Sequence, residues 1–283
     1  MKTSQTSIAK PRTGWDERVG AYRAKPCGTG DLDSDPSIMV QEQISRLKFF
    51  GDHCDVRSHS VLDLGCGTGF NCEYLRTRYG APGTLGIDIS PNVIAYARKR
   101  YPYNKFAVAD VCDSGARFGK ERWDRIICCE VIEHVEHPGR LLANVSRHLN
   151  EDGIALITTP NLQVFSLGRV PSPLNATHIK EFTCREFETL LRRYFRRVAL
   201  FGQRFTEPAL FHRRQNALRR TISDVNLLGD LYWNGLIRRV WKTIRLEPIH
   251  RLKSGALRWR WTDFAFDSPP SENAVWLCAI VQP

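Results

Sequence analysis

The stretch Val61–Gly69 constrains the fold of this 283-residue chain more than any other, because a short apolar run leads directly into three glycines. Gly65, Gly67 and Gly69 alternate with single residues, so the backbone can turn tightly and a ligand can approach it closely. An apolar strand followed by such a turn is typical of a loop that binds a nucleotide-containing cofactor. An ordinary tight turn between a strand and a helix stays open as the alternative.

Two further apolar segments downstream of this loop contain acids near their ends. Thr84–Ser90 contains Asp88, and Phe106–Val111 contains Asp110. An acid after the second strand can accept hydrogen bonds from ribose hydroxyls, and the acid after the third lies where an adenine amino group could be bound. The glycine spacing is G-x-G-x-G, and neither Lys-Ser nor Lys-Thr follows it. The pattern therefore argues against a dinucleotide and against a triphosphate-binding P-loop.

These features resemble those of the class I S-adenosylmethionine-dependent methyltransferases, over roughly residues 58–205 and the end of the chain. The resemblance implies that the glycine loop packs against the methionine part of the cofactor, that Asp88 holds the ribose, and that Asp110 and Val111 frame the adenine. For Glu130, contact with the methionine end of the cofactor is one alternative to a role in the chemistry. The full set of cofactor-binding residues implied is Asp63, Gly65, Cys66, Gly67, Gly69, Asp88, Ile89, Asp110, Val111, Cys129 and Glu130.

Short apolar runs alternate with helical patterns along the chain, which predicts an open, mostly parallel sheet with helices on both faces. We expect helices at 70–79, 91–101, 138–149 and 184–195, and later strands at 123–129, 153–159, 197–205 and 274–281. Ser90 and Thr183 are the expected N-caps. By the resemblance, the last two strands form an antiparallel edge hairpin. The predicted fold is therefore a doubly wound, Rossmann-like α/β fold with a seven-stranded sheet.

The chain is 42% hydrophobic and 25% charged, enough for one substantial core with an extra lobe. We expect a helical cap over 1–58, a cofactor-binding core over 59–205 and 273–283, and a basic helical insertion over 206–272, between the last two strands. The cap contains a helical stripe of Val40, Ile44 and Leu47. Its residues 1–14 and 28–36 have the composition of flexible connections, and its expected pocket residues are Trp15, Tyr22 and Met39.

The insertion carries most of the positive charge. Residues 204–260 hold 13 Lys and Arg against four Asp and Glu, hence nine of the eleven net positive charges. Apolar residues at helical spacing alternate with basic ones, which predicts a basic amphipathic helix containing Trp233, Ile237, Arg238, Arg239, Val240, Trp241, Lys242, Ile244 and Arg245. Three roles stay open: a lid on the core, contact with anionic lipid headgroups, or contact with RNA phosphates.

No apolar signal core follows Met1, and no apolar run approaches the roughly 18 residues of a membrane span. We therefore expect a cytoplasmic protein, with peripheral membrane contact through the insertion as an open option. The nine cysteines include no C-x-x-C pair, and several fall in or beside the expected core strands, namely Cys66, Cys128, Cys129 and Cys278. We expect them to be reduced packing residues.

The segment after the fourth strand, Cys129–His137, is the expected centre of the chemistry, because ligands of doubly wound sheets bind beyond the carboxyl ends of the strands. Glu130, Glu133 and His134 stand at i, i+3 and i+4, so a helical turn would project them toward one side. Such a group could hold a divalent ion: magnesium favours the oxygens, and zinc or manganese accepts the imidazole. His178, after the fifth strand, is expected at the same rim.

The E-x-x-E-H sequence with a later histidine is similar to that of two methyltransferase groups. In the ubiquinone-biosynthesis O-methyltransferases it supports a magnesium ion during methylation of a ring hydroxyl. In the small-RNA 2′-O-methyltransferases two glutamates and two histidines bind a metal. The resemblance implies a metal site of Glu130, Glu133, His134 and His178.

Many metal-free relatives carry a similar glutamate-histidine pair, so a site without metal is the alternative. His134 is then the candidate general base, since an unperturbed imidazole has a pKa of roughly 6.5. His178 would orient the substrate oxygen, which gives the expected catalytic set His134, Glu130 and His178. A purely structural role also stays open, in which Glu133 and His134 hydrogen-bond the neighbouring loop.

The sequence therefore predicts an S-adenosylmethionine-dependent O-methyltransferase that acts on a small or lipid-linked molecule such as a phenol, a polyketide-like compound or a sugar. The alternative is a metal-dependent RNA 2′-O-methyltransferase, which the basic insertion keeps open although no RNA-binding module is present in the sequence. A cofactor-binding partner protein without catalysis is a third class, which the intact glycine loop and acids disfavour.

Overall fold

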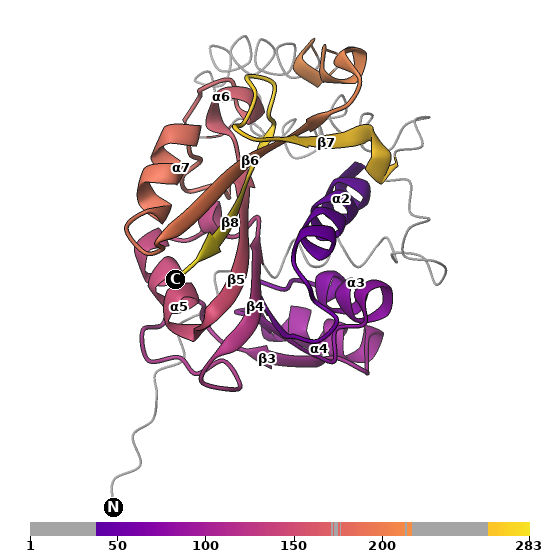
Figure 1. The fold of residues 1–283 in the computed structure, drawn as a ribbon, viewed down its shortest axis with the longest axis vertical. Helices are drawn as coiled ribbons and strands as arrows, with labels where there is room; N and C mark the ends of the chain where they lie inside the picture. Colours follow the sequence, from indigo (N-terminus) through magenta and orange to yellow (C-terminus); the bar gives the residue numbers. More distant parts are fainter. Residues whose placement is uncertain (1–37, 171, 173–174, 176, 213, 217–259) are drawn as a thin grey trace, which may run out of the picture.

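The structure, a computed structural model, describes residues 38–170, 172, 175, 177–212, 214–216 and 260–283. Its centre is an eight-stranded sheet with the strand order β3-β2-β1-β4-β5-β8-β6-β7 (Figure 1). β1 to β5 pair in parallel. β8 is antiparallel to both of its neighbours, β5 and β6, and β7 is antiparallel to β6. The doubly wound α/β fold expected from the sequence is confirmed.

The elements follow the alternation expected from the sequence. The strands are β1 (Ser60–Leu64), β2 (Gly83–Asp88), β3 (Lys105–Val108), β4 (Trp123–Cys129), β5 (Leu149–Pro160), β6 (Arg197–Phe205), β7 (Phe264–Asp267) and β8 (Trp276–Gln282). The helices are α2 (Ile38–His53), α3 (Phe70–Tyr79), α4 (Pro91–Arg100), α5 (Pro138–His148), α6 (Leu162–Phe165) and α7 (Cys184–Leu191), with single 3-10 turns η2 (Ile132–His134) and η3 (Trp261–Asp263). Both predicted caps are confirmed, since the Ser90 and Thr183 side chains accept hydrogen bonds from backbone amides in the first turns of α4 and α7.

Helices cover both faces of the sheet, with α5 and α7 on one side and α2, α3 and α4 on the other (Figure 1). On the first face, side chains of α5 and α7 such as Leu142 and Phe187 pack in one core with Leu62 and Ile157 of the sheet. On the second face, α2 and α3 pack against Val61, Ile127 and Leu156. β1 and β4 are thus buried from both sides, which explains their almost continuous apolar sequences.

Helix α2 confirms the helical stripe predicted near residue 40. Ile44 and Leu47 are fully buried in the second core, and Val40 packs against it. Phe49, also on α2, stacks on Phe266 of β7 with ring centres 4.2 Å apart. Helix α2 therefore packs next to the edge strand β7. It also reaches the region beyond the carboxyl ends of β4 and β5.

The sheet differs from the prediction at its outer edge. An eighth strand, β7, lies within the residues expected to form the insertion, and it pairs with β6 from Phe205↔Phe264 to Gly202↔Asp267. The predicted pairing of the last two long strands is confirmed, since β6 and β8 are antiparallel neighbours. β7 was missed because four residues give too short a pattern to be recognised within a charged segment.

The predicted amphipathic helix containing Trp233 and Trp241 lies outside the described residues, as do Trp15 and Tyr22. The eight cysteines within the described part of the chain are free, and six of them are buried. Among the helices that the structure describes, none combines the length and the apolar character needed to cross a membrane.

Candidate active site

The glycine loop links β1 to α3 at the carboxyl end of the sheet. Gly65, Gly67 and Gly69 all have positive φ values, of 75°, 53° and 85°. The amides of Gly65 and Cys66 donate to the Ile87 carbonyl at 2.8 Å, which ties the loop to β2. Because β1 and β4 are neighbours while their following helices lie on opposite faces, the loop borders the point where the strand order reverses, the usual ligand site of this architecture.

The three glycines face different surroundings. A Cβ atom on Gly65 would lie 2.4 Å from a methyl group of Val131, and one on Gly69 would lie 2.6 Å from the Phe106 ring. A Cβ on Gly67 would meet no atom within 4 Å. Gly65 and Gly69 therefore allow close packing of the protein on itself, whereas Gly67 borders open space that a ligand could fill.

Asp88 braces this loop. Its Oδ2 accepts a hydrogen bond from the Gly67 amide at 3.0 Å, and its Oδ1 accepts one from the Ser90 amide at 2.9 Å. Burial raises the pKa of Asp88, although these backbone amides oppose the shift. A carboxylate can accept up to about four hydrogen bonds, so Asp88 retains acceptor capacity for ribose hydroxyls.

The other residues expected around the nucleoside lie near Asp88 with different exposures. Ile89 leaves 46% of its surface exposed, so an apolar side chain is available beside the acid. Asp110 accepts a hydrogen bond from the Cys112 amide at 2.8 Å. The Val111 side chain is buried in the core between the sheet and α5, so any contact of Val111 with an adenine would use its backbone.

Asp63 is completely buried at the end of β1. Its carboxylate accepts hydrogen bonds from Asn71 at 3.4 Å and from the Cys72 thiol at 3.9 Å. Burial raises the pKa of Asp63 to about 7, and the charge of Asp88 adds to the rise while the hydrogen bond from Asn71 opposes it. Asp63 therefore supports the base of the glycine loop from inside the protein.

Glu130, the first residue after β4, has a left-handed backbone with φ 57°. Its Oε1 accepts a hydrogen bond from Thr158 Oγ1 at 2.9 Å and lies 3.9 Å from Arg46 Nη1. The side chain keeps 26% of its surface exposed. The expectation that Glu130 points the same way as Glu133 and His134 is wrong, because the turn that follows is a single 3-10 turn beginning at Ile132 and does not include Glu130.

Arg46 of α2 is a site residue that sequence reasoning missed. Its side chain is 1% exposed, and its Nε donates to Gln203 at 2.7 Å while Nη1 donates to Gln43 at 3.0 Å. Its guanidinium lies over the Trp276 ring at 5.0 Å. Burial is the largest single effect and opposes the charge, but the nearby groups together, Glu130 and Glu42 first among them, raise the pKa of Arg46. A basic residue that interrupts an apolar helical stripe was the available signal.

A second group of side chains follows β4 and β5 and is separate from the contact between Glu130 and Arg46. Glu133, His134 and His178 bring their ligand atoms within 4.8 Å of one another. Glu133 is fully buried; its Oε2 accepts from Thr159 Oγ1 at 3.1 Å, and its Oε1 has no hydrogen-bond partner among the residues described. Burial raises the pKa of Glu133 well above its ordinary value, and the charge of Glu130 adds to the rise.

Both imidazoles are held through Nδ1. His134 Nδ1 lies 3.0 Å from the Thr177 carbonyl, which only accepts, so Nε2 carries the lone pair of the neutral ring. His178 Nδ1 lies 2.7 Å from Glu181 Oε1, and its Nε2 lies 2.8 Å from Asn175 Nδ2. The two rings meet edge to face with centres 4.7 Å apart. Glu181 was missed, although its position three residues after His178 was the available signal.

The loop after β5 is bound directly to the turn after β4. The backbone carbonyl of Glu133 accepts hydrogen bonds from the amides of Ile179 and Lys180, at 2.8 and 3.2 Å. This contact brings His178 to the rim where the sequence placed it. The expected alternative, in which Glu133 and His134 hydrogen-bond the neighbouring loop, therefore coexists with their position at the site.

A divalent cation fits three of these residues. Glu133 offers an unpartnered buried oxygen, and each imidazole is held at Nδ1 by an acceptor, the arrangement that orients histidine ligands in metal sites. Binding through His178 Nε2 would replace its contact with Asn175. Glu130 is not part of this group among the described residues, so the four-ligand set implied by the resemblance becomes a three-residue set.

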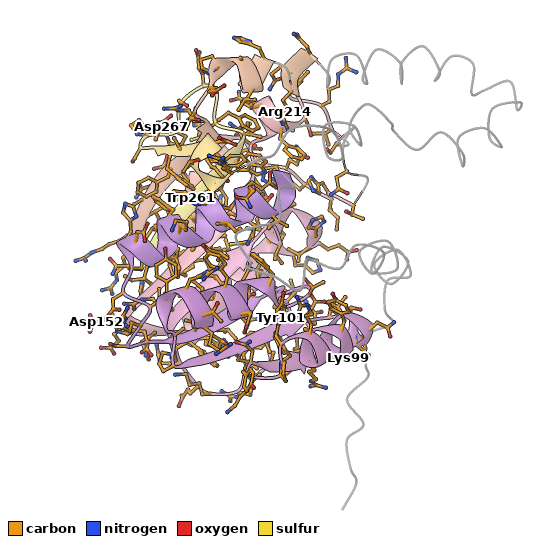
Figure 2. All side chains as sticks on the ribbon, turned by 90° about the vertical axis from the view of Figure 1, so that its right-hand side faces the viewer. Lys99, Tyr101, Asp152, Arg214, Trp261 and Asp267 are labelled. Atoms are coloured by element: carbon orange, nitrogen blue, oxygen red, sulfur yellow. The ribbon has the colours of Figure 1, made fainter. Side chains whose placement is uncertain are left out.

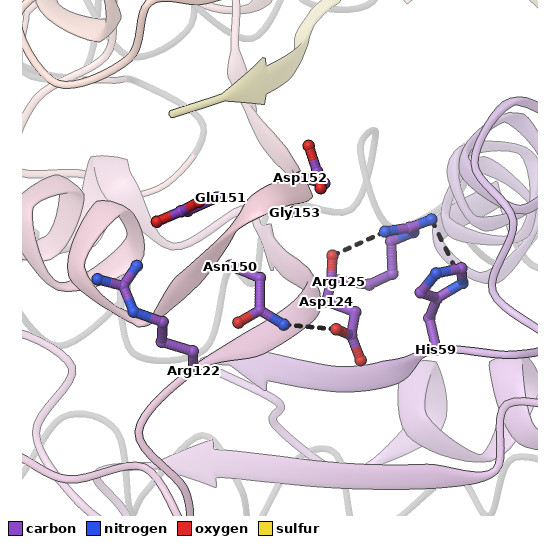
Figure 3. Close-up of a pocket in the computed structure, with 8 residues that line it drawn as sticks. All are labelled: His59, Arg122, Asp124, Arg125, Asn150, Glu151, Asp152 and Gly153. Atoms are coloured by element: carbon purple, nitrogen blue, oxygen red, sulfur yellow. Dashed lines mark hydrogen bonds between the residues drawn. The ribbon is translucent and has the colours of Figure 1, made fainter.

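An open hollow of about 520 Å³ lies at the opposite end of the strands, at the beginnings of β4 and β5 (Figure 3). Arg125 spans it, donating to the carbonyls of Asp55 and Asp124 at 2.8 and 2.9 Å. Asn150 donates to Asp124. These polar side chains are thus bound within the protein, and the hollow lies at the amino ends of strands whose carboxyl ends border the glycine loop and the histidines.

Three comparisons identify relatives of the chain. Residues 39–194, more than half of the chain, match the family described as Methyltransferase domain. A probable S-adenosylmethionine-dependent methyltransferase of Mycobacterium tuberculosis is 28% identical over 161 residues, 57% of this chain and 56% of that protein. The ubiquinone biosynthesis O-methyltransferase of Neisseria meningitidis is 30% identical over 122 residues, 41% of this chain and 50% of that protein. The chain spans about half the length of these curated relatives.

The fold is also that of solved methyltransferases. Phosphoethanolamine N-methyltransferase 2 of Haemonchus contortus, solved with S-adenosyl-L-methionine, superposes with a TM-score of 0.59 at 17% identity, covering all of this chain and 61% of that chain. The family match extends from α2 through the glycine loop and the Glu133–His134 turn to the end of α7. The chain therefore belongs to the methyltransferase-domain family.

Proposed function

We propose that this protein is an S-adenosylmethionine-dependent O-methyltransferase that acts on a hydroxyl group of a small or lipid-linked molecule. The observation that carries the proposal is the position of His134 beyond the carboxyl end of β4. The Thr177 carbonyl holds its Nδ1, and Glu133 Oε1 lies 3.9 Å from its Nε2. A ring held in this way can take the proton of an acceptor hydroxyl.

The residues of the glycine loop and of the strand ends fit the cofactor. Gly67 borders open space, and Asp88 retains acceptor capacity on a carboxylate fixed by two amides. The exposed part of the Glu130 carboxylate suits the ammonium group of the methionine moiety. When bound, S-adenosylmethionine supplies a methyl group that is already activated by its sulfonium. The protein then has to align an oxygen with that methyl group and exclude water, and positioning alone supplies several kcal/mol.

Proton removal falls to His134 in this proposal. The imidazolium that forms when His134 takes the hydroxyl proton would stand 3.9 Å from Glu133 Oε1, a buried carboxyl oxygen without a hydrogen-bond partner among the described residues. His178, bound by Glu181 and Asn175, orients the acceptor oxygen. In a metal-loaded form, Glu133, His134 and His178 would hold the ion, which would lower the pKa of the hydroxyl.

We propose oxygen as the acceptor atom because of the side chains at the site; the fold does not distinguish oxygen from nitrogen acceptors. A solved neighbour with this fold is named as an N-methyltransferase, whereas one curated relative is named as an O-methyltransferase of ubiquinone biosynthesis. A hydroxyl must lose a proton during transfer, and a general base beside a buried acid serves that need. Phenols, polyketide-like compounds and sugars remain the proposed acceptor classes.

RNA methylation remains the alternative prediction, and most of the basic residues that suggest it lie outside the described part of the chain. Salt separates the two functions. Binding to RNA falls steeply with rising salt because it releases counterions, whereas transfer to a small acceptor responds weakly. Contact of the insertion with anionic lipid, and its role as a lid, likewise stay proposals.

The test uses S-adenosylmethionine with a radioactive methyl group and a cell extract separated into lipid, small-molecule and RNA fractions. We expect label in the lipid or small-molecule fraction at both 50 and 300 mM salt, and its release as methyl iodide by hydroiodic acid, which cleaves methyl ethers. His134→Ala should lower the rate by about 100-fold or more with cofactor affinity unchanged, and His137→Ala, an adjacent control, should not. Label only in RNA, or a rate unchanged in His134→Ala, would contradict the proposal.

A further inference from the structure

Two polar side chains after β6 bind the same backbone atom of α6. Arg214 Nη1 donates to the Val164 carbonyl at 3.3 Å, and Gln215 Nε2 donates to it at 3.1 Å. Residues 208–212 and 214–216 are helical. Arg214 and Gln215 are thereby fixed over α6, which immediately follows the strand that supplies Thr158 and Thr159 to the site.

The positive charge of Arg214 has no ion-pair partner among the described residues. Its guanidinium lies over the Phe165 ring with the Cζ atom 5.0 Å from the ring centre. Burial lowers the pKa of Arg214 to about 10, which Glu42 and Glu181 oppose only through longer-range attraction. The Arg214 side chain is only partly buried, so a ligand that brings an anion can reach its charge.

Gln215 adds an independent unsatisfied group. The residue is 6% exposed, and within the part of the chain that the structure describes its buried Oε1 has no hydrogen-bond partner. Buried polar atoms are normally paired, so this oxygen marks a place for a donor. Arg214 and Gln215 therefore lie side by side against α6. Among the described residues, the arginine has no anionic partner and the glutamine oxygen has no hydrogen-bond donor.

Phe165 connects this pair to the proposed acceptor position. Its ring centre lies 5.7 Å from that of His178, with 31° between the ring planes. Arg214 is thus separated from the proposed chemical centre by a single phenyl ring. Phe165 packs against the aromatic cluster of Phe205, Phe264 and Trp276. Figure 2 shows Arg214 at the same end of the molecule as Asp267, away from Lys99 and Asp152.

We propose that Arg214 recognises an acidic group, a carboxylate, phosphate or sulfate, on an acceptor whose apolar or aromatic body lies against Phe165. Gln215 accepts a hydrogen bond from a donor on the same acceptor. This inference rests on the proposed function, which it narrows from hydroxylated molecules in general to anionic ones. Arg is suited to the task because its planar fork binds such groups through two donors.

The experiment uses a fluorescent aromatic anion, 8-anilinonaphthalene-1-sulfonate, and its neutral analogue N-phenyl-1-naphthylamine, each titrated into the full chain. The anion should bind in a saturable way and be displaced by benzoate. Arg214→Met, which keeps an unbranched apolar side chain but removes the charge, should weaken anion binding at least tenfold and leave the neutral probe unchanged. Arg192→Gln removes an exposed arginine paired with Glu188 on the far side of α7 and should change neither probe.

Anion binding that is absent, insensitive to benzoate or equal in wild type and Arg214→Met would overturn the inference; equal binding would indicate that Arg214 pairs within the protein, for example with Glu181. If Arg214→Met does not fold, Arg214→Lys decides: it keeps the charge but loses the two-donor fork, so it should still weaken the anion at least threefold. Calorimetry of the wild-type protein with S-adenosylmethionine separates the two proposals. If the wild type does not bind the cofactor, the proposed function is contradicted, whereas the anion result still stands.

Discussion

Glu130 Oε1 and Arg46 Nη1 lie 3.9 Å apart, although one residue follows β4 and the other lies on the helix that precedes the sheet. The acid is one-quarter exposed and the arginine is almost completely buried. Glu130 is therefore held from inside the protein while part of its side chain is exposed. This relationship separates the role of Glu130 from that of Glu133, which is only three residues away.

Replacing either member of this pair should give distinct results. Glu130→Gln is expected to weaken S-adenosylmethionine binding about tenfold, roughly 1.4 kcal/mol, because an ammonium group loses its counter-charge. Arg46→Met is expected to lower the free energy of unfolding by about 2–4 kcal/mol, because Glu130 and Gln203 lose a buried donor. Calorimetry and urea unfolding measure the two effects. Wild-type affinity in Glu130→Gln would mean that the carboxylate only braces Thr158.

Gly67 and Gly65 form a matched pair for testing the cofactor cradle. Both have positive φ, so alanine costs roughly 1–2 kcal/mol of strain at either position. Gly65→Ala also collides with Val131 and should destabilise the protein further, whereas the Cβ of Gly67→Ala enters open space. We expect Gly67→Ala to stay folded and to lose most cofactor affinity, as read by thermal melting and calorimetry. Normal affinity in a folded Gly67→Ala would locate the cofactor elsewhere.

Asp63 should make stability fall as the pH rises. Its pKa is raised from 3.8 to about 7 in the folded protein, so between these values the folded state holds a proton that the unfolded state has released. The contribution is favourable below about pH 4 and is lost progressively up to about pH 7, by on the order of 4 kcal/mol. Asp63→Asn should therefore gain stability relative to wild type across this range. Urea unfolding at pH 4, 5.5 and 7 measures the difference; a constant difference would show that Asp63 is ionised when folded.

Metal binding can be measured without an acceptor. After chelator treatment, we expect Mn²⁺ or Zn²⁺ to raise the melting temperature, since binding to the folded state stabilises it by mass action. The rise should disappear in Glu133→Ala and His178→Ala and remain in Glu130→Gln, which lies outside the three-residue group. No shift with either ion would leave His134 as an unassisted base, and loss of the shift in Glu130→Gln would restore the four-ligand set.

The local sequence was sufficient for much of the fold and the cofactor loop. The alternation of apolar runs and helices predicted the parallel sheet, and the spacing of Gly65, Gly67 and Gly69 predicted a turn with positive φ values. The caps at Ser90 and Thr183 were predictable for the same reason. These features depend on neighbouring residues and on the backbone conformations that each residue type allows.

Only the tertiary structure shows that Glu130 and Glu133, the two acids after β4, bind on opposite faces of the sheet. Thr158 and Thr159 are consecutive on β5, so their side chains point to opposite faces of the sheet. Thr158 binds Glu130 on the face covered by α2, and Thr159 binds Glu133 on the other face. A sequence spacing of three residues predicted one shared face, because it could not include the left-handed backbone at Glu130 or the hydrogen bonds from β5.

The partners of the site residues were likewise decided by long-range packing. Arg46 reaches Glu130 from α2, and Arg214 covers Phe165 from beyond β6. Each contact joins elements that meet only when the sheet is assembled. No local sequence pattern specifies the strand order that brings them together. The sequence by itself determined the family, the loop and the candidate residues, whereas the assembled sheet determined which of those residues can act together.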